Sequence, residues 1–156
     1  MIRFEAMPTE EARAYQAGKP DANGQTPERH ICDGDGVPCR HCQQDIAAGD
    51  AYLILNYRPF PSRQPYAESG PIFLHADPCE RFEEGNVPPR MFFQNGRRYL
   101  IKGYNAQDRI VYGTGKIVEP SDMPAAAEAI LGRDGVKYVH VRSALNNCYQ
   151  CRIDRA

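Results

Sequence analysis

Several features that would indicate a membrane, secreted or nucleic-acid-binding protein are missing from this sequence. No apolar run is long enough to cross a bilayer, and the first residues, which include Arg3 and Glu5, lack the apolar stretch of a signal peptide. Neither sign of charge is in excess, since 19 Lys and Arg residues balance 20 Asp and Glu residues. We therefore expect a cytoplasmic protein that binds no membrane and is a poor partner for nucleic acid.

Histidine is scarce, with four in 156 residues, whereas six cysteines are present. The reducing cytoplasm favours metal binding or redox chemistry over disulfides for such cysteines. Cys39-Arg-His-Cys42 is followed, after 32 intervening residues, by His75-Ala-Asp-Pro-Cys79. Three thiolates and one imidazole complete a tetrahedral shell for zinc, and the cost of closing the loop grows only logarithmically with its length. The spacing predicts a structural zinc site, and the alternative is that these are ordinary buried thiols and a hydrogen-bonded histidine.

A catalytic zinc site is the competing hypothesis for the same residues. Pro38-Cys-Arg-His-Cys42 and His75-Ala-Asp77 resemble elements of zinc-dependent nucleobase deaminases, in which three ligands leave a position for water. Here the elements come in reversed order, Asp77 is shorter than the usual Glu, and Cys79 can fill the open position. A zinc-dependent hydrolase or deaminase-like enzyme with Asp77 as proton shuttle is therefore the alternative. His41, between the two cysteines, is expected to face solvent.

The three other cysteines give a weaker signal. Cys32, Cys148 and Cys151 could form a second four-ligand shell with His30 or His140. If Cys148 and Cys151 share a regular strand, their spacing places them on opposite faces of it. We expect ordinary buried thiols, while a second zinc site or a redox pair stays open.

The periodicity of apolar residues predicts an α+β fold with a mainly antiparallel mixed sheet, two short helices and a zinc-knot-like insertion. One domain is expected over 1–156, with a zinc-binding subregion at about 30–85. The segment 19–38 is rich in Gly, Pro, Asp and Asn and predicts a loop. Strands are expected at 2–6, 51–57, 71–75, 98–104, 109–118, 136–142 and 149–154, and helices after Pro8 and over 122–131.

Polar side chains alternate with apolar ones near the carboxyl end. Alternation places Tyr138, His140 and Arg142 on one face of a strand, opposite a face that we take as the core. Polar residues of the last strand can join this polar face. We expect a solvated face with cross-strand ion pairs. The alternative is a site for a small anion or carboxylate, because Arg side chains supply several fixed donors.

Segments along nearly the whole chain resemble a small bacterial family of unknown function, domain of unknown function 1203. The resemblance rests on the segments 38–42, 53–57, 70–75, 138–141 and 148–156. It implies a single bacterial domain of about this length, and it supplies no activity and no catalytic residues. The leading hypothesis is a small binding or interaction domain with one structural zinc ion and an unknown protein or small-molecule partner.

Overall fold

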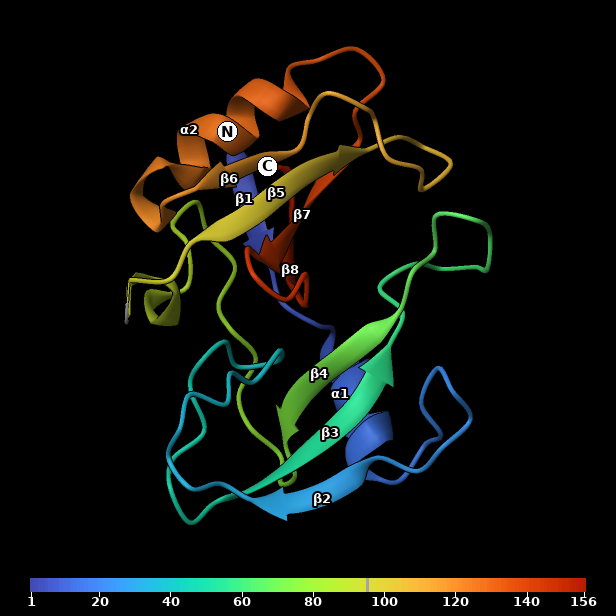
Figure 1. The fold of residues 1–156 in the computed structure, drawn as a ribbon, viewed down its shortest axis with the longest axis vertical. Coiled ribbons are helices and arrows are strands. Elements are labelled where there is room, and N and C mark those ends of the chain that lie inside the picture. Colours follow the sequence, from blue (N-terminus) through green and yellow to red (C-terminus); the bar gives the residue numbers. More distant parts are fainter. Residues whose placement is uncertain (95) are drawn as a thin grey trace.

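The computed structural model describes residues 1–94 and 96–156, whose strands form two antiparallel sheets, one above the other in Figure 1. The larger sheet has five strands in the spatial order β1 (Ile2–Glu5), β8 (Tyr149–Arg155), β7 (Tyr138–Ser143), β5 (Tyr99–Tyr104) and β6 (Lys116–Val118). The smaller sheet has three strands in the order β2 (Glu28–Ile31), β3 (Ala51–Tyr57) and β4 (Gly70–His75). The α+β class is as expected, with two sheets where one was expected.

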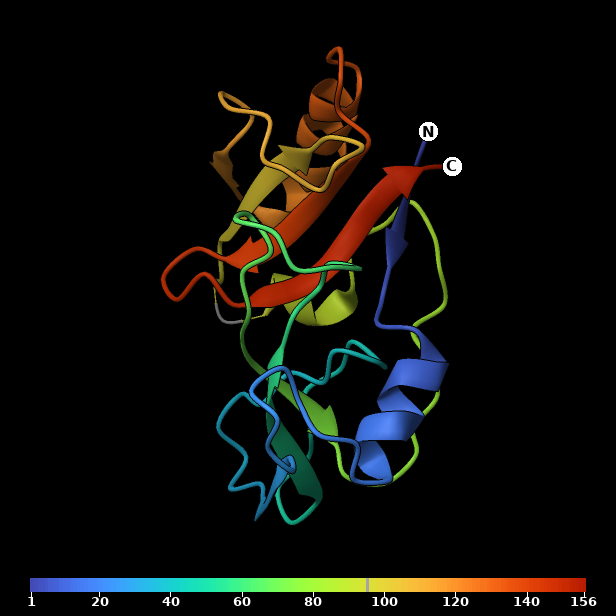
Figure 2. The ribbon, with the colours of Figure 1, turned by 90° about the vertical axis from the view of Figure 1, so that its right-hand side faces the viewer.

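Each sheet packs against one α-helix. The helix α2 (Met123–Leu131) carries its buried side chains in one stripe and lies against the five-stranded sheet. The helix α1 (Thr9–Gln16) belongs to the half that contains the three-stranded sheet (Figure 2) and shares a second core with β3 and β4. Two short 3-10 helices, η1 (Arg90–Phe93) and η2 (Pro120–Asp122), lie in the connections.

The chain begins and ends in the larger sheet. After β1 it passes through α1 and the three strands of the smaller sheet, and then returns to the larger sheet at β5. The pairing of β1 with β8 places Ile2 opposite Arg155, so the two ends lie side by side (Figures 1 and 2). In the sequence, the smaller sheet is thus an insertion between β1 and the other four strands of the larger sheet.

Two local predictions were wrong. The segment 19–38 contains the strand β2, whose four residues are all exposed, so the alternation of apolar residues that marks a half-buried strand is missing. The strand expected at 109–118 is only β6. Before β6 the Thr114 hydroxyl accepts a hydrogen bond from the Gly103 amide at 2.9 Å, so a side chain replaces a backbone partner there.

The polar face predicted to be solvated is buried. His140 is 1% exposed and Arg142 is 4% exposed. The side chain of Phe60, from the segment between β3 and β4, packs on this face with its ring 5.0 Å from that of His140. Residues far away in the sequence thus cover a strand face that looks solvent-facing from its own pattern.

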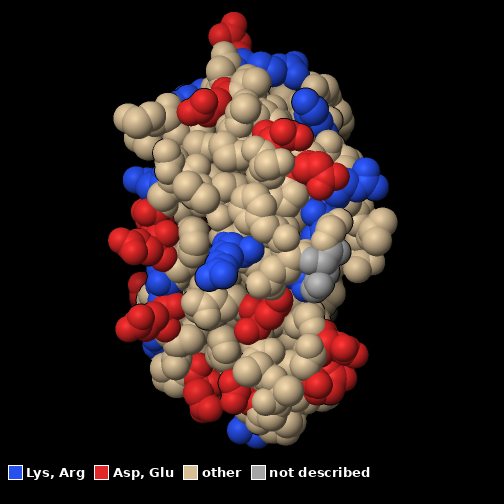
Figure 3. Space-filling model, turned by 90° about the vertical axis from the view of Figure 1, so that its left-hand side faces the viewer, with Lys and Arg blue, Asp and Glu red and all other residues tan. Residues whose placement is uncertain are grey.

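Charges of both signs are mixed over the surface shown in Figure 3. Acidic and basic side chains interleave on this face, in keeping with the near balance of 19 basic and 20 acidic residues. The part of the surface in view has no broad basic area of the kind that binds a phosphate backbone.

Candidate metal centre

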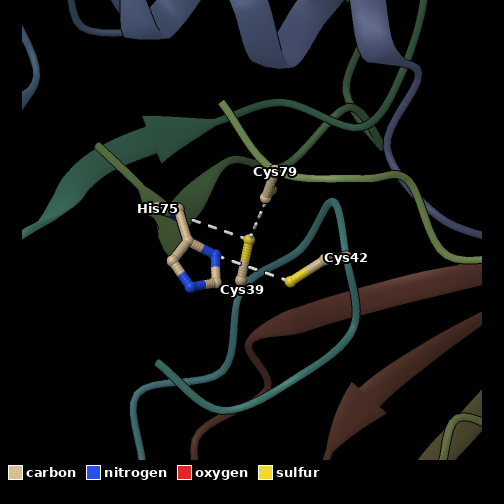
Figure 4. A group of neighbouring side chains, drawn as sticks. All are labelled: Cys39, Cys42, His75 and Cys79. Atoms are coloured by element: carbon tan, nitrogen blue, oxygen red, sulfur yellow. Dashed lines mark hydrogen bonds between the residues drawn. The ribbon is translucent and has the colours of Figure 1, made fainter. Parts of the chain in front are cut away.

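Four side chains that the spacing of the sequence predicts as ligands come together in space. The ligand atoms of Cys39, Cys42, His75 and Cys79 all lie within 4.8 Å of one another (Figure 4). Within residues 1–94 and 96–156 this is the one group of His, Cys, Asp or Glu residues found to have such geometry. The group could therefore hold a metal ion.

Cys39 and Cys42 project from a tight turn at 38–45. The Cys39 amide donates to the carbonyl oxygen of Gln44, and the Gln43 amide donates to that of Cys39, both at 3.0 Å. A parallel bridge joins Cys39 to Phe73 of β4. This bridge brings the first cysteine pair beside the end of β4, where the His75 amide donates to the Cys39 Sγ at 3.4 Å.

The helix α1 holds the second half of the group. The Gln16 side-chain amide donates to the carbonyl oxygens of His75 and Asp77, at 3.0 and 3.1 Å. The Arg13 guanidinium donates to the carbonyl oxygen of Cys79 at 2.8 Å. The short loop after β4 is thereby fixed by contacts to its backbone.

Two of the distances within the group match those of a tetrahedral zinc site. With Zn–S of about 2.3 Å and Zn–N of about 2.0 Å, tetrahedral angles place two sulfurs about 3.8 Å apart and a sulfur and a nitrogen about 3.5 Å apart. The Sγ atoms of Cys39 and Cys79 are 3.9 Å apart, and Cys42 Sγ is 3.5 Å from Nδ1 of His75. The donor set and its spacing therefore suit zinc.

The close approach of these donors perturbs their protonation. Hydrogen bonds from Cys42 and Cys79 lower the pKa of the Cys39 thiol, and the same contact with Cys39 raises the pKa of Cys42. Hydrogen bonds to Cys39 and Cys79 raise the pKa of His75 to about 10. The three thiols and the imidazole therefore share protons through hydrogen bonds. A divalent cation bound by all four would replace these protons.

His41 does not face solvent, contrary to the prediction. It is fully buried, with Nδ1 3.1 Å from Cys79 Sγ and Nε2 2.9 Å from the Thr9 hydroxyl. Burial lowers its pKa, so the ring is neutral and carries one proton. A metal-bound Cys79 would be a thiolate, which only accepts hydrogen bonds; the proton would then lie on Nδ1, and the Thr9 hydroxyl would donate to Nε2. His41 thus orients Cys79 rather than replacing a ligand.

Two further residues of the turn bind the larger sheet. Arg40 is buried and donates from Nε to the carbonyl oxygen of Tyr149 at 2.5 Å, and the side-chain amide of Gln43 donates to that of Gln150 at 3.0 Å. Burial lowers the pKa of Arg40 to about 10, so it stays charged at neutral pH and offsets thiolate charge nearby. The turn that carries Cys39 and Cys42 is therefore fastened to β8.

The remaining cysteines do not gather. Cys32 is buried in the core of the smaller sheet and Cys151 in the core beneath α2, while Cys148 precedes β8 and is partly exposed. Residues 1–94 and 96–156 therefore hold no second metal group like the first. Asp77 has an exposed side chain and is not part of the group.

A family model described as "Protein of unknown function (DUF1203)" matches residues 36–155. The chain belongs to this family. The matched range contains Cys39, Cys42, His75 and Cys79 and most of both sheets. Comparisons with curated proteins and with solved structures found no match. In the described part of the chain, no helix has the length and apolar character needed to cross a membrane.

Proposed function

We propose that Cys39, Cys42, His75 and Cys79 hold one structural zinc ion, and that the zinc stabilises a small binding or interaction domain. The observation that carries this proposal is the convergence of four ligand atoms within 4.8 Å. Four protein ligands leave no position for water or substrate, which is typical of structural zinc. All six cysteines are free, as the reducing cytoplasm would keep them.

The zinc ion would reinforce a junction that the bridge between Cys39 and Phe73 already holds in register. It connects the turn at 38–45 to the end of β4. Arg40 and Gln43 of the same turn bind β8. The free energy of zinc binding, of order 10 kcal/mol, then contributes to the stability of the junction between the sheets. The proposed domain spans 1–156, with the zinc-binding subregion at about 30–85 and an unknown protein or small-molecule partner.

A catalytic zinc is less well supported. A hydrolase or deaminase needs a ligand position for water and a proton shuttle beside it. Cys79 lies in the group as the fourth donor, and Asp77 is exposed and is not part of the group. X-ray absorption of the zinc-loaded protein distinguishes the two: three sulfurs and one nitrogen support the structural site, and a missing sulfur with an added oxygen supports catalysis.

The direct test is elemental analysis of the purified protein and of Cys42→Ser, with Cys148→Ser as the matched control outside the group. We expect one zinc ion per chain in the wild type and in Cys148→Ser. Cys42→Ser is expected to lose most of its zinc and to unfold at a lower temperature, because a serine hydroxyl does not replace a thiolate ligand. Full zinc content and an unchanged melting temperature in Cys42→Ser contradict the proposal.

A further inference from the structure

A second site lies between the two sheets, away from the metal group. It is a partly open pocket of about 170 Å³ bounded by the segment between β3 and β4 and by the turn between β7 and β8. Tyr57, Pro59 and Tyr149 supply an apolar wall, whereas Arg142 and Glu68 are its charged residues. A pocket with one apolar wall and a few convergent polar groups is typical of a small-molecule site.

Arg142 is the buried anchor of this pocket. Its side chain is 5% exposed, and Nη1 donates to the carbonyl oxygen of Asn147 at 3.2 Å. Its Nε and Nη2 are buried and have no hydrogen-bond partner among the described residues. These two donors stand side by side on one edge of the guanidinium group, the arrangement that binds both oxygens of a carboxylate. Buried donors without hydrogen bonds are costly, so an acceptor placed along this edge would be favoured.

The charges around Arg142 do not balance. Oε1 of Glu68 lies 3.3 Å from Nη2 of Arg142 and 3.3 Å from Nζ of Lys102, so two cations share one carboxylate oxygen. The neighbouring Arg152 has its own partner in Asp154, at 2.6 Å. Burial and the surrounding cations hold the pKa of His140 well below its ordinary value, so it is neutral. One positive charge in this interior is left without a counter-charge.

The buried Tyr104 hydroxyl lies beside the guanidinium group of Arg142. The charge of Arg142 acts on this hydroxyl and opposes the burial that raises its pKa to about 12. Glu68, in contrast, is 40% exposed at its side chain, so its carboxylate borders solvent.

We propose that the pocket binds a small organic carboxylate with one negative charge. Its oxygens accept hydrogen bonds from Nε and Nη2 of Arg142 in place of Glu68, which turns outward, and its carbon chain lies against Tyr57 and Tyr149. A cavity of about 150 Å³ holds a benzene molecule, so the ligand has about six to eight non-hydrogen atoms. The site goes beyond the proposed zinc role and does not depend on it.

The test is an NMR titration of the ¹⁵N-labelled protein, with its metal content measured first. Sodium butyrate is the probe, and butyramide and sodium sulfate at equal ionic strength are the comparisons. We expect butyrate to give saturable shifts of amide signals from Ser69, Asn147 and Cys148, with an affinity of about 1 mM for a ligand of this size. Butyramide lacks the charge and sulfate lacks the planar carboxylate, so both should give weaker shifts.

Three variants make the test specific to this pocket. Arg142→Gln removes the charged edge and should weaken butyrate binding about tenfold or more. Glu68→Gln removes the carboxylate that competes for Arg142 and should strengthen butyrate binding. Arg152→Gln is the matched control, because it changes the same charge on the neighbouring strand at a residue that does not line the pocket.

Each other outcome overturns the proposal. If butyrate gives no saturable shifts, or if sulfate and butyrate shift the same signals equally, the pocket is not a carboxylate site. If Glu68→Gln fails to bind and unfolds more easily, Glu68 is the permanent partner of Arg142. The zinc content of Arg142→Gln should equal that of the wild type, so failure here is distinguishable from failure of the zinc proposal.

Discussion

His140 lies inside a box of four aromatic rings. The rings of Phe60, Tyr104, Tyr138 and Tyr149 have their centroids 4.7 to 5.1 Å from that of His140. The Nδ1 atom is buried without a hydrogen-bond partner among the described residues, and burial holds the pKa well below the ordinary 6.5. The folded protein therefore keeps this histidine neutral under conditions in which the unfolded chain protonates it.

This burial predicts that acid destabilises the protein through His140. Below pH 6.5 the unfolded chain binds a proton that the folded protein excludes, so stability is full above pH 6.5 and falls as the pH falls toward the folded pKa. Urea unfolding between pH 7 and 5.5 should show wild-type stability falling faster than that of His140→Phe, by up to about 1.4 kcal/mol per pH unit.

The control for this prediction is the metal content, measured at each pH in both proteins, so that loss of metal is not mistaken for titration of His140. Equal slopes for the wild type and His140→Phe would show that His140 is protonated equally in the folded and unfolded states.

How much the sequence reveals about the position of a residue depends on how local its signal is. Cys39, Cys42, His75 and Cys79 stand at short spacings that have a chemical meaning on their own, and they do come together. The burial of His41 depends on α1 and on the loop that carries Cys79, which its own neighbours do not reveal. The polar face of β7 is likewise buried by a distant segment.

At the scale of elements, the turn at 38–45 depends on an unusual backbone conformation. Gln43 has a φ of 56°, in the left-handed region that costs a residue other than glycine about 1 to 2 kcal/mol. Its side chain donates two buried hydrogen bonds, to the carbonyl oxygens of Arg40 and Gln150. The side chain thus compensates for the backbone strain and fastens the turn to β8.

Two substitutions separate these contributions. Gln43→Ala keeps the strain and loses both hydrogen bonds, so we expect it to lower the free energy of unfolding by about 2 to 3 kcal/mol. Gln43→Gly loses the same bonds but relieves the strain, so it should be about 1 kcal/mol more stable than Gln43→Ala. Urea unfolding of the metal-loaded proteins measures both. An alanine variant as stable as the wild type would mean that this contact does not fasten the turn.

The elements that sequence predicts well are those with one apolar face. In β3 the buried and partly buried residues alternate along all seven positions, and α2 has an apolar stripe with Gly132 after it. The strand β2 has neither property, because it lies at the edge of its sheet and is held by its backbone pairing with β3. A strand without a buried face gives no periodic signal.

At the scale of the whole molecule, the metal group lies where the two halves meet. Its ligands come from the half built on β2, β3 and β4. The turn at 38–45, which carries Cys39 and Cys42, contacts β8 of the other half. The larger sheet has a core of its own beneath α2, which includes no metal ligand. The two halves should therefore respond differently when the metal is removed.

Amide hydrogen exchange with and without a chelator measures this difference. On metal removal, amides of the turn at 38–45 and of the end of β4 should exchange at least about tenfold faster, because the ion no longer opposes local opening. Amides of Ile101, Val139 and Val141, in the core beneath α2, should keep most of their protection. Equal loss of protection everywhere would indicate that the protein unfolds as one unit, and no change would show that the metal is dispensable.

The division into two sheets could not be predicted from the sequence. Each strand was expected from its own residues, but the choice of neighbour depends on contacts between distant segments, such as β5 with β7 and β3 with β4. A pattern of strands and helices is compatible with one sheet or two. In this protein α1 and α2 pack into separate cores, which goes with two sheets rather than one.

The pairing of β1 with β8 also sets the order in which the chain is able to fold during synthesis. Its contacts, such as Phe4 with Ile153, join residues at opposite ends of the sequence. The residues of the metal group, at 39–79, leave the ribosome well before β8, so the smaller half is able to form while β1 still lacks its partner strand. Completing the larger sheet closes the longest loop in the protein, which makes it the slow and late step.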